Sequence, residues 1–170
     1  MRIIDWLDSY LQEKINKISI FKYLDENEKK ILLKFAHFHE YYQDEKIITQ
    51  GETSYSFYAL IGGKLNVTIN GENGEQIQIS HIDEGEFFGE TGIFDDGQRT
   101  ATVSAEKTSQ VLVIERNDFF CYIRMYPKAG IKLMMLFVNG LMKKLNASNK
   151  ELVVGKKTSI DKIPFFEDMT

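Results

Sequence analysis

The chain of 170 residues has little cysteine or proline and no long apolar segment: it contains one cysteine, Cys121, and two prolines. One cysteine cannot form an internal disulfide, which is typical of proteins from a reducing cytoplasm. The longest uninterrupted apolar run, residues 133–138, is far shorter than the roughly 20 residues that a membrane-spanning helix needs. Asp5 and Asp8 near the N-terminus argue against a signal peptide. We therefore expect a cytoplasmic protein that does not bind or cross a membrane.

An excess of positive charge is also missing, since 21 Lys and Arg residues stand against 25 Asp and Glu residues, a net charge of −4. Domains that bind nucleic acid usually carry a basic face. A helix-turn-helix module takes about 60 or more residues, and the segment after residue 150 is only residues 151–170. We expect no specific DNA binding by this chain itself. Hydrophobic residues at 43% and charged residues at 27% fit one globular domain.

The three histidines do not form a convincing metal motif. His37 and His39 would lie on one face of a strand, as the first two ligands do in cupins. Glu45 comes too late for the third ligand, and His81 is the only candidate for the fourth. No catalytic triad, P-loop or dinucleotide-binding glycine pattern is present. The sequence therefore predicts neither a metal cofactor nor an enzyme.

Alternation of apolar and polar residues with a period of two is present from residue 38 through much of the chain. The segments predicted as strands include residues 47–49, 57–61, 65–69, 77–79 and 111–113, with Val103 in another. Asn70-Gly71 and Asn73-Gly74 are strong signals for hairpin turns. Many short strands with tight turns favour an antiparallel sandwich or jelly roll.

Helical periodicity is found on both sides of this strand region. Near the N-terminus, apolar residues three and four apart form one stripe: Ile4, Leu7, Leu11, Ile15 and Ile18. Asp25 and Glu28 have the spacing of a capping box. Asn117 is expected to cap a later helix, and Pro127 suits the first turn of a longer one. The long helix carries a second stripe: Ile131, Met134, Val138, Leu141 and Leu145. That stripe could cover the strands, pair with a second copy, or close over a ligand.

The most specific pattern is Phe-Gly-Glu followed, after eight residues, by Arg-x-Ala-Thr and an aliphatic residue: Phe88, Gly89, Glu90, Arg99, Ala101, Thr102 and Val103. It resembles the phosphate-binding cassette of cyclic nucleotide-binding domains, the family of the catabolite activator protein, the kinase regulatory subunits and the cyclic nucleotide-gated channels. The wider resemblance covers about residues 18–150. It implies a mainly β fold, a jelly-roll-like antiparallel β-roll (double-stranded β-helix) with N-terminal helices and two C-terminal helices.

The residue types of this cassette suit a cyclic phosphodiester. Arg99 would meet the phosphate with a planar fork of donors, and Gly89 would let the backbone approach the ligand closely. Residues 90–94 are predicted to form a short helix with free amides at its start. In the family, the glutamate at the position of Glu90 accepts from the ribose 2′-hydroxyl. The set of predicted nucleotide contacts is Phe88, Gly89, Glu90, Thr91, Arg99, Thr100 and Ala101.

The identity of the base is less constrained. Thr100 resembles the hydroxyl residue of cyclic GMP-binding members, whereas cyclic AMP-binding kinase subunits carry Ala there. The catabolite activator protein has Ser at this place and binds cyclic AMP. Cyclic AMP is slightly favoured, as the commoner ligand of stand-alone members.

We divide the chain into an N-terminal helix over residues 1–18, predicted from its apolar stripe, the nucleotide-binding domain over residues 19–150, which the resemblance implies, and a tail over residues 151–170. In the tail, residues 162–170 echo residues 17–25, with identity at Lys, Ile and Phe. The tail is either the start of a second such domain or an aromatic segment that docks on this one.

We predict a non-enzymatic sensor domain that binds a cyclic nucleotide and transmits the signal through its C-terminal helices. The conformational change would be transmitted to a second copy of the chain, paired through the long helix, or to a separate effector protein. The alternative is a ligand-free roll that serves as an interaction or dimerisation module.

Overall fold

The computed structural model describes residues 1–3, 13–71, 73–95 and 97–160, with backbone alone for 147–148 and 150–160. The chain divides into two units, residues 1–133 and residues 134–170. The first unit holds the strands of the described residues and the predicted cassette. The second unit contains most of one long helix.

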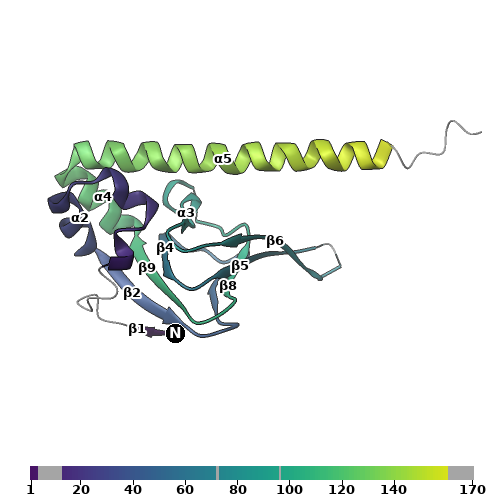
Figure 1. Cartoon of the computed structure of the whole chain (residues 1–170), viewed down its shortest axis with the longest axis horizontal. Coiled ribbons are helices and arrows are strands. Elements are labelled where there is room, and N and C mark those ends of the chain that lie inside the picture. Colours follow the sequence, from purple (N-terminus) through teal and green to yellow (C-terminus); the bar gives the residue numbers. More distant parts are fainter. Residues whose placement is uncertain (4–12, 72, 96, 161–170) are drawn as a thin grey trace, which may run out of the picture. The chain divides into compact units, whose positions relative to one another are not determined.

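Two antiparallel sheets form the roll in the first unit (Figure 1). The five-stranded sheet has, in spatial order, β1 (Arg2–Ile3), β2 (Ala36–Tyr41), β9 (Ser109–Glu115), β4 (Ser56–Gly62) and β7 (Phe87–Phe88). The four-stranded sheet has β3 (Lys46–Ile48), β8 (Thr102–Ala105), β5 (Leu65–Asn70) and β6 (Gln76–Ile82). The predicted β-roll, with helices on either side of it in sequence, is confirmed.

Strand alternation sends two sets of apolar side chains to opposite faces of the five-stranded sheet. On one face lie residues that pack with β5 and β8 in the interior of the roll: Tyr58, Leu60, Val111 and Val113, against Leu65 and Val103. On the other face Phe57 meets Phe119 with ring centroids 5.3 Å apart. Both faces of β4 and β9 are therefore buried, which explains their nearly continuous apolar sequence.

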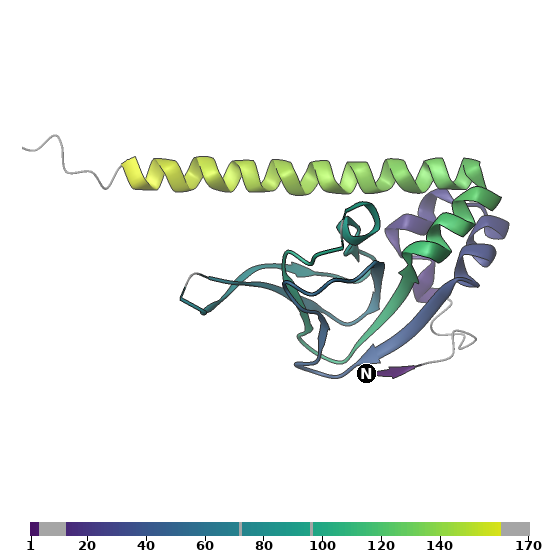
Figure 2. The same ribbon diagram turned by 180° about the vertical axis from the view of Figure 1, so that it is seen from behind.

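The hairpin of β5 and β6 extends from the roll (Figure 2). Residues Asn70 and Gln76 face each other at its end. Gly74 has φ +80°, a conformation that its lack of a side chain permits. A register shift near Val67 places a bulge in the hairpin. The predicted hairpin is confirmed.

The helical elements are η1 (Ser19–Tyr23), α2 (Glu26–Leu33), α3 (Thr91–Phe94), α4 (Arg116–Met125) and α5 (Pro127–Ile160). The capping box predicted for α2 is present, because Glu28 N donates to Asp25 Oδ1 at 2.8 Å and Asp25 N donates to Glu28 Oε2 at 2.9 Å. The cap predicted at Asn117 is wrong. Helix α4 begins at Arg116, and the N-cap residue is Glu115, which makes no side-chain cap bond.

The predicted N-terminal helix over residues 1–18 does not include the first residues, since Arg2–Ile3 is a strand paired with β2. Glu13–Ile15 are helical, and Ile15 and Ile18 are buried. The remainder of that stripe, in residues 4–12, lies outside the described residues. So do residues 161–170, which include the predicted repeat.

The apolar stripe predicted on the long helix does not match the buried face of α5. In the first unit, Ala129 and Leu133 are buried, whereas Ile131 is 62% exposed. Further along α5 the exposed apolar residues continue at steps of four and three: Met135, Val138, Met142 and Leu145. The apolar sequence of α5 therefore includes an exposed face. Within the described chain, no helix is apolar enough over the length required to cross a membrane.

Candidate functional site

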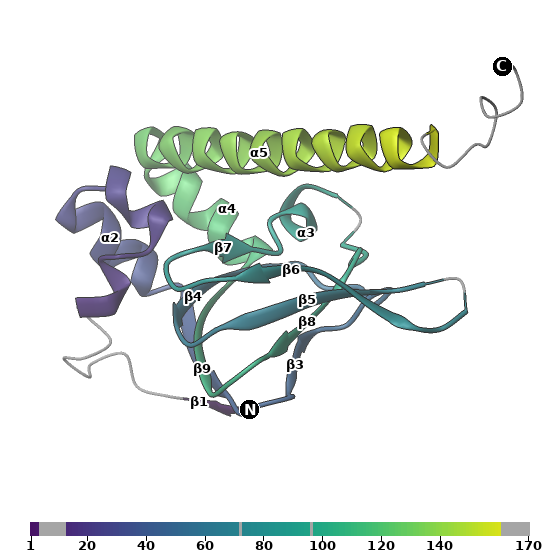
Figure 3. The ribbon, with the colours of Figure 1, turned by 45° about the vertical axis from the view of Figure 1, so that its right-hand side comes forward.

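The cassette leaves β7, turns through α3 at the rim of the roll and re-enters the sheets at β8 (Figure 3). Gly89, directly after β7, has φ +72°. A Cβ atom added there would lie 2.9 Å from Tyr58 Cδ2 and 3.0 Å from Arg99 Nη1. Gly89 is therefore required both by its backbone conformation and by the close approach of the tyrosine and the guanidinium.

Arg99 is the central residue of the site, and only 4% of it is exposed. Its Nη1 donates to the Gly89 carbonyl at 2.8 Å. Its Nη2 donates to the Ser56 carbonyl at 2.6 Å and to Ser54 Oγ at 3.1 Å. The guanidinium carbon lies 5.5 Å from the centre of the Tyr58 ring, within the range of a cation–π contact.

These contacts do not use every donor of the Arg99 guanidinium, which has five N–H groups. Nε is buried and has no hydrogen-bond partner among the described residues. A buried N–H without an acceptor is costly, more so in a charged group. The site therefore holds a desolvated cation with donor capacity left for an anionic ligand.

Helix α3 packs tightly against this guanidinium. A Cβ atom added to Gly92 would lie 2.6 Å from Arg99 Nη1 and 2.6 Å from the Ser54 carbonyl oxygen. Any side chain at Gly92 would displace α3 or Arg99. The short helix predicted over residues 90–94 is confirmed, with four residues assigned as helical.

The other predicted contact residues lie around Arg99 with different exposure. Phe88 is buried and stacks on the Tyr58 ring, with centroids 5.1 Å apart. Glu90 is 1% exposed and occupies the N-cap position of α3. Thr91 and Ala101 are half-buried, and Thr100 is exposed. The fold therefore brings both charged residues of the pattern into one buried region, although nine positions separate them in sequence.

The sequence did not indicate three groups that hold Arg99. Two of them are backbone carbonyls, of Gly89 and Ser56, and a backbone acceptor has no residue-type signal. The third is the hydroxyl of Ser54, which lies 45 positions before Arg99. Only the pairing of distant segments could have revealed it.

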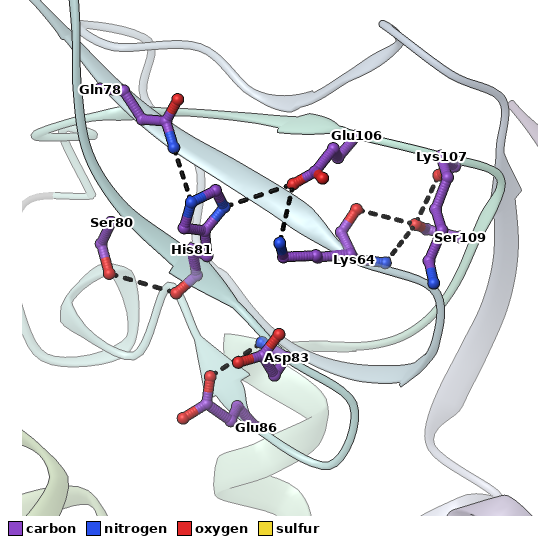
Figure 4. A network of polar contacts seen from close by, with 9 residues as sticks. All are labelled: Lys64, Gln78, Ser80, His81, Asp83, Glu86, Glu106, Lys107 and Ser109. Carbon is purple, nitrogen blue, oxygen red and sulfur yellow. Dashed lines mark hydrogen bonds and ion pairs between the residues drawn. The ribbon is translucent and has the colours of Figure 1, made fainter.

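His81, on β6, belongs to a polar network with Gln78, Glu106 and Lys64 (Figure 4). Its Nδ1 lies 3.3 Å from Glu106 Oε2, and its Nε2 lies 2.8 Å from Gln78 Nε2. Lys64 Nζ lies 3.4 Å from the same Glu106 oxygen. His37 and His39 lie on β2 in the other sheet, so the three histidines do not converge. In the described part of the chain, no three His, Cys, Asp or Glu residues are placed to share a metal ion.

A cavity of about 600 Å³ lies next to the start of α4, lined by Tyr55, Ser56, Glu115, Arg116 and Asn117. The Arg116 guanidinium stacks over the Tyr55 ring at 5.4 Å. None of the predicted nucleotide contacts lines this cavity. The cavity nevertheless adjoins the cassette, because the Ser56 carbonyl accepts from Arg99 and Arg116 Nη1 donates to the Asp95 carbonyl at 3.3 Å.

Comparison with protein families identifies the domain. The model of the family described as "Cyclic nucleotide-binding domain" matches residues 38–126, more than half of the chain. The chain belongs to the cyclic nucleotide-binding domain family. The matched range contains the whole cassette and the strands that carry it.

Relatives of known function and solved structures agree with this membership. The "cAMP-activated global transcriptional regulator CRP" of Salmonella typhimurium is 32% identical over 102 residues, which are 59% of this chain and 49% of the relative. The "Cyclic AMP receptor protein" of Thermus thermophilus is 28% identical over 101 residues, which are 59% of this chain and 47% of the relative. The chain spans about half the length of the curated relatives it matches.

Two solved structures share the fold. The catabolite activator protein of Thermus thermophilus aligns with a TM-score of 0.69 at 26% identity, over 81% of this chain and 62% of the other. A cyclic nucleotide-binding domain from Methylobacillus flagellatus aligns with a TM-score of 0.75 at 20% identity, over 86% and 82%. The second similarity, at this low identity, concerns the fold alone.

Proposed function

We propose that this domain is a non-enzymatic sensor that binds a cyclic nucleotide at the cassette. The observation that carries the proposal is the buried Arg99 guanidinium, whose Nε has no acceptor among the described residues. A phosphodiester anion would supply that acceptor through a charge-assisted hydrogen bond. Gly89 and Gly92 leave the backbone close to the guanidinium without side chains in the way.

The other contacts follow from the chemistry of the ligand. Glu90, buried at the start of α3, is the candidate acceptor for the ribose 2′-hydroxyl. Thr91 and Ala101 would contact the sugar-phosphate from the two ends of the cassette. Phe88, stacked on Tyr58, would hold the start of the cassette in place. Thr100 is exposed and free to meet the base.

Cyclic AMP is the ligand we propose ahead of cyclic GMP. The support is the names of the similar regulators from Salmonella typhimurium and Thermus thermophilus, both of which refer to cyclic AMP. Cyclic GMP remains the competing ligand, because the hydroxyl of Thr100 could contact a guanine base.

We further propose that the nucleotide-binding domain comprises residues 19–150 and that the protein is located in the cytoplasm.

We further propose that ligand binding shifts the C-terminal helices and that a twin subunit or an effector protein reads the shift. Support comes from contacts within the first unit that join the start of α5 to α2. Lys132 Nζ lies 2.8 Å from Glu28 Oε2, and the Tyr122 hydroxyl donates to the Glu28 carbonyl at 3.1 Å. A displacement of α4 or α5 would either break these contacts or move α2 along with the displaced helix.

A second candidate function is a ligand-free interaction module. One observation favours it: three protein acceptors already bind the Arg99 guanidinium. This candidate predicts no change in melting temperature with cyclic AMP or cyclic GMP. A ligand at 100 times its dissociation constant would instead stabilise the fold by about 2.7 kcal/mol.

Calorimetric titration with cyclic AMP and cyclic GMP tests the proposal. We expect Arg99→Ala to lose roughly 2–5 kcal/mol of binding free energy, because the phosphate would lack its counter-charge in a desolvated site. Arg124→Ala is the matched control, since Arg124 is an exposed arginine in the last turn of α4, outside the cassette. Equal affinity of Arg99→Ala and wild type would refute the assignment of the site. If the wild type binds neither nucleotide after any co-purified ligand has been removed, the ligand-free interaction module becomes the supported function.

A further inference from the structure

The Arg99 guanidinium offers two edges on which a pair of parallel N–H donors can bind two oxygens of one anion. One edge combines Nε with Nη2, and the other combines Nη1 with Nη2. Every two-point contact with a phosphate therefore needs a hydrogen of Nη2. In this structure both Nη2 hydrogens are engaged, one by the Ser56 carbonyl and one by Ser54 Oγ. A phosphate that uses the full fork must displace one of these two acceptors.

The two acceptors differ in how easily they can leave. The Ser56 carbonyl belongs to β4, which is paired with β7 on one side and β9 on the other. Its contact with Nη2 is short, at 2.6 Å, and moving it would disturb the strand. Ser54 lies before the first residue of β4, and its contact with Nη2 is longer, at 3.1 Å. Its hydroxyl can withdraw by rotation about one side-chain bond.

We propose that Ser54 is a positioning residue whose hydroxyl holds Arg99 Nη2 in the ligand-free state and is displaced by the phosphate of the nucleotide. The inference rests on the proposed function. In the free protein, Ser54 Oγ keeps one donor of a buried cation satisfied. On binding, a phosphate oxygen takes its place on Nη2, and a second phosphate oxygen reaches a neighbouring donor such as Nε, which has no acceptor among the described residues.

Displacement of the Ser54 hydroxyl by phosphate predicts opposite effects on stability and on affinity, which a purely structural role of Ser54 does not. Removing the hydroxyl leaves an unsatisfied N–H in the free protein, but the bound state has already given up that contact. Ser54→Ala should therefore destabilise the free protein and tighten nucleotide binding at the same time. A residue that only oriented Arg99 for the ligand would weaken binding when truncated.

The experiment compares wild type, Ser54→Ala, Ser54→Thr and Ser19→Ala by thermal unfolding without ligand and by titration with cyclic AMP. We expect Ser54→Ala to melt a few degrees lower and to bind about three- to tenfold more tightly, as for one hydrogen bond. Ser54→Thr keeps a hydroxyl and should behave like the wild type. Ser19→Ala makes the same chemical change in η1, outside the cassette, and should change neither quantity.

The possible failures separate the two proposals. If wild type binds cyclic AMP and Ser54→Ala binds it equally or more weakly, the displacement is refuted while the sensor function stands. Unchanged thermal stability of ligand-free Ser54→Ala would also refute the proposed displacement of the Ser54 hydroxyl. If no variant, wild type included, binds cyclic AMP or cyclic GMP, both the sensor function and the role of Ser54 are overturned.

Discussion

At the scale of single residues, the site consists of a buried cation and the small groups that allow it to be buried. The Arg99 guanidinium has neutral acceptors, two carbonyls and one hydroxyl, and an aromatic face beside it. Burial removes water from the guanidinium and strengthens its electrostatic interactions relative to those in bulk water. An anionic ligand therefore gains more at this site than it would at an exposed arginine.

His39 supplies a pH-dependent prediction at the same scale. Burial is the main cause that lowers its pKa, followed by the charges of His37 and the N-terminal ammonium group. Its Nδ1 is buried without a partner among the described residues, and its ring meets Tyr41 edge-on at 6.2 Å. The folded protein thus disfavours protonated His39, whereas the unfolded chain binds the proton with an ordinary pKa near 6.5.

Because the unfolded state binds more protons below that pH, the free energy of unfolding should decrease as the pH falls below about 6.5. Chemical denaturation at several pH values between 8 and 5 would measure this decrease. In His39→Phe the slope over this range should become smaller. His37→Gln removes a neighbouring like charge but not the burial, so it should reduce the slope only in part. An unchanged slope in His39→Phe would assign the pH dependence to other groups.

At the scale of elements, Glu28 joins two helices through one oxygen. Its Oε2 accepts from Asp25 N in the capping box of α2 and from Lys132 Nζ at the start of α5. The side chain of Glu28 is 12% exposed and that of Lys132 is 40% exposed. Partial exposure limits the ion pair to about 1 kcal/mol or less, and the cap contributes about 1 kcal/mol.

We therefore expect Glu28→Ala to lower the free energy of unfolding by about 1–2 kcal/mol, since it removes both contacts. Lys132→Met should lower the free energy of unfolding by about 1 kcal/mol or less, because it removes only the ion pair. A double-mutant cycle of the two, measured by urea denaturation, gives their coupling. Lys29→Met is a control, because Lys29 pairs at 2.8 Å with Glu26, which is 78% exposed. A coupling near zero would show that Glu28 acts only as a cap.

Several elements could be predicted from local sequence. The capping box and the hairpin glycines depend on neighbours within a few residues, so their signals are complete in the sequence. Asn117 shows where such a signal fails. Arg116 N donates to the Tyr55 carbonyl at 2.7 Å, so a distant segment satisfies the first amide of α4 and the helix starts earlier.

At the scale of the whole molecule, the exposed apolar face of α5 is the basis for the proposed homodimer. Ile131, Met135, Val138, Met142 and Leu145 follow one another at steps of four and three, the spacing of a coiled-coil seam. Each of these side chains is more than half exposed. An identical helix from a second copy would present the same spacing and could bury both faces.

Replacing Met135 and Met142 with Glu should convert the dimer to a monomer, because four like charges would meet within the seam. Light scattering coupled to size-exclusion chromatography measures the mass of wild type and variant. Lys143→Glu introduces a negative charge outside the seam and should leave the dimer intact. A wild type that is monomeric at high concentration would refute pairing through α5 and leave an effector protein as the reader of the signal.

The mainly β fold, the hairpin, the capping box and the cassette with Arg99 and Glu90 could all be predicted from local sequence, because periodicity, turn chemistry and a fixed spacing are local properties. Long-range packing sets which groups hold the Arg99 guanidinium, where α4 begins and which face of α5 is exposed. These features depend on distant segments and on backbone atoms. A carbonyl oxygen is the same in every residue, so the sequence does not show which carbonyls the fold brings to Arg99.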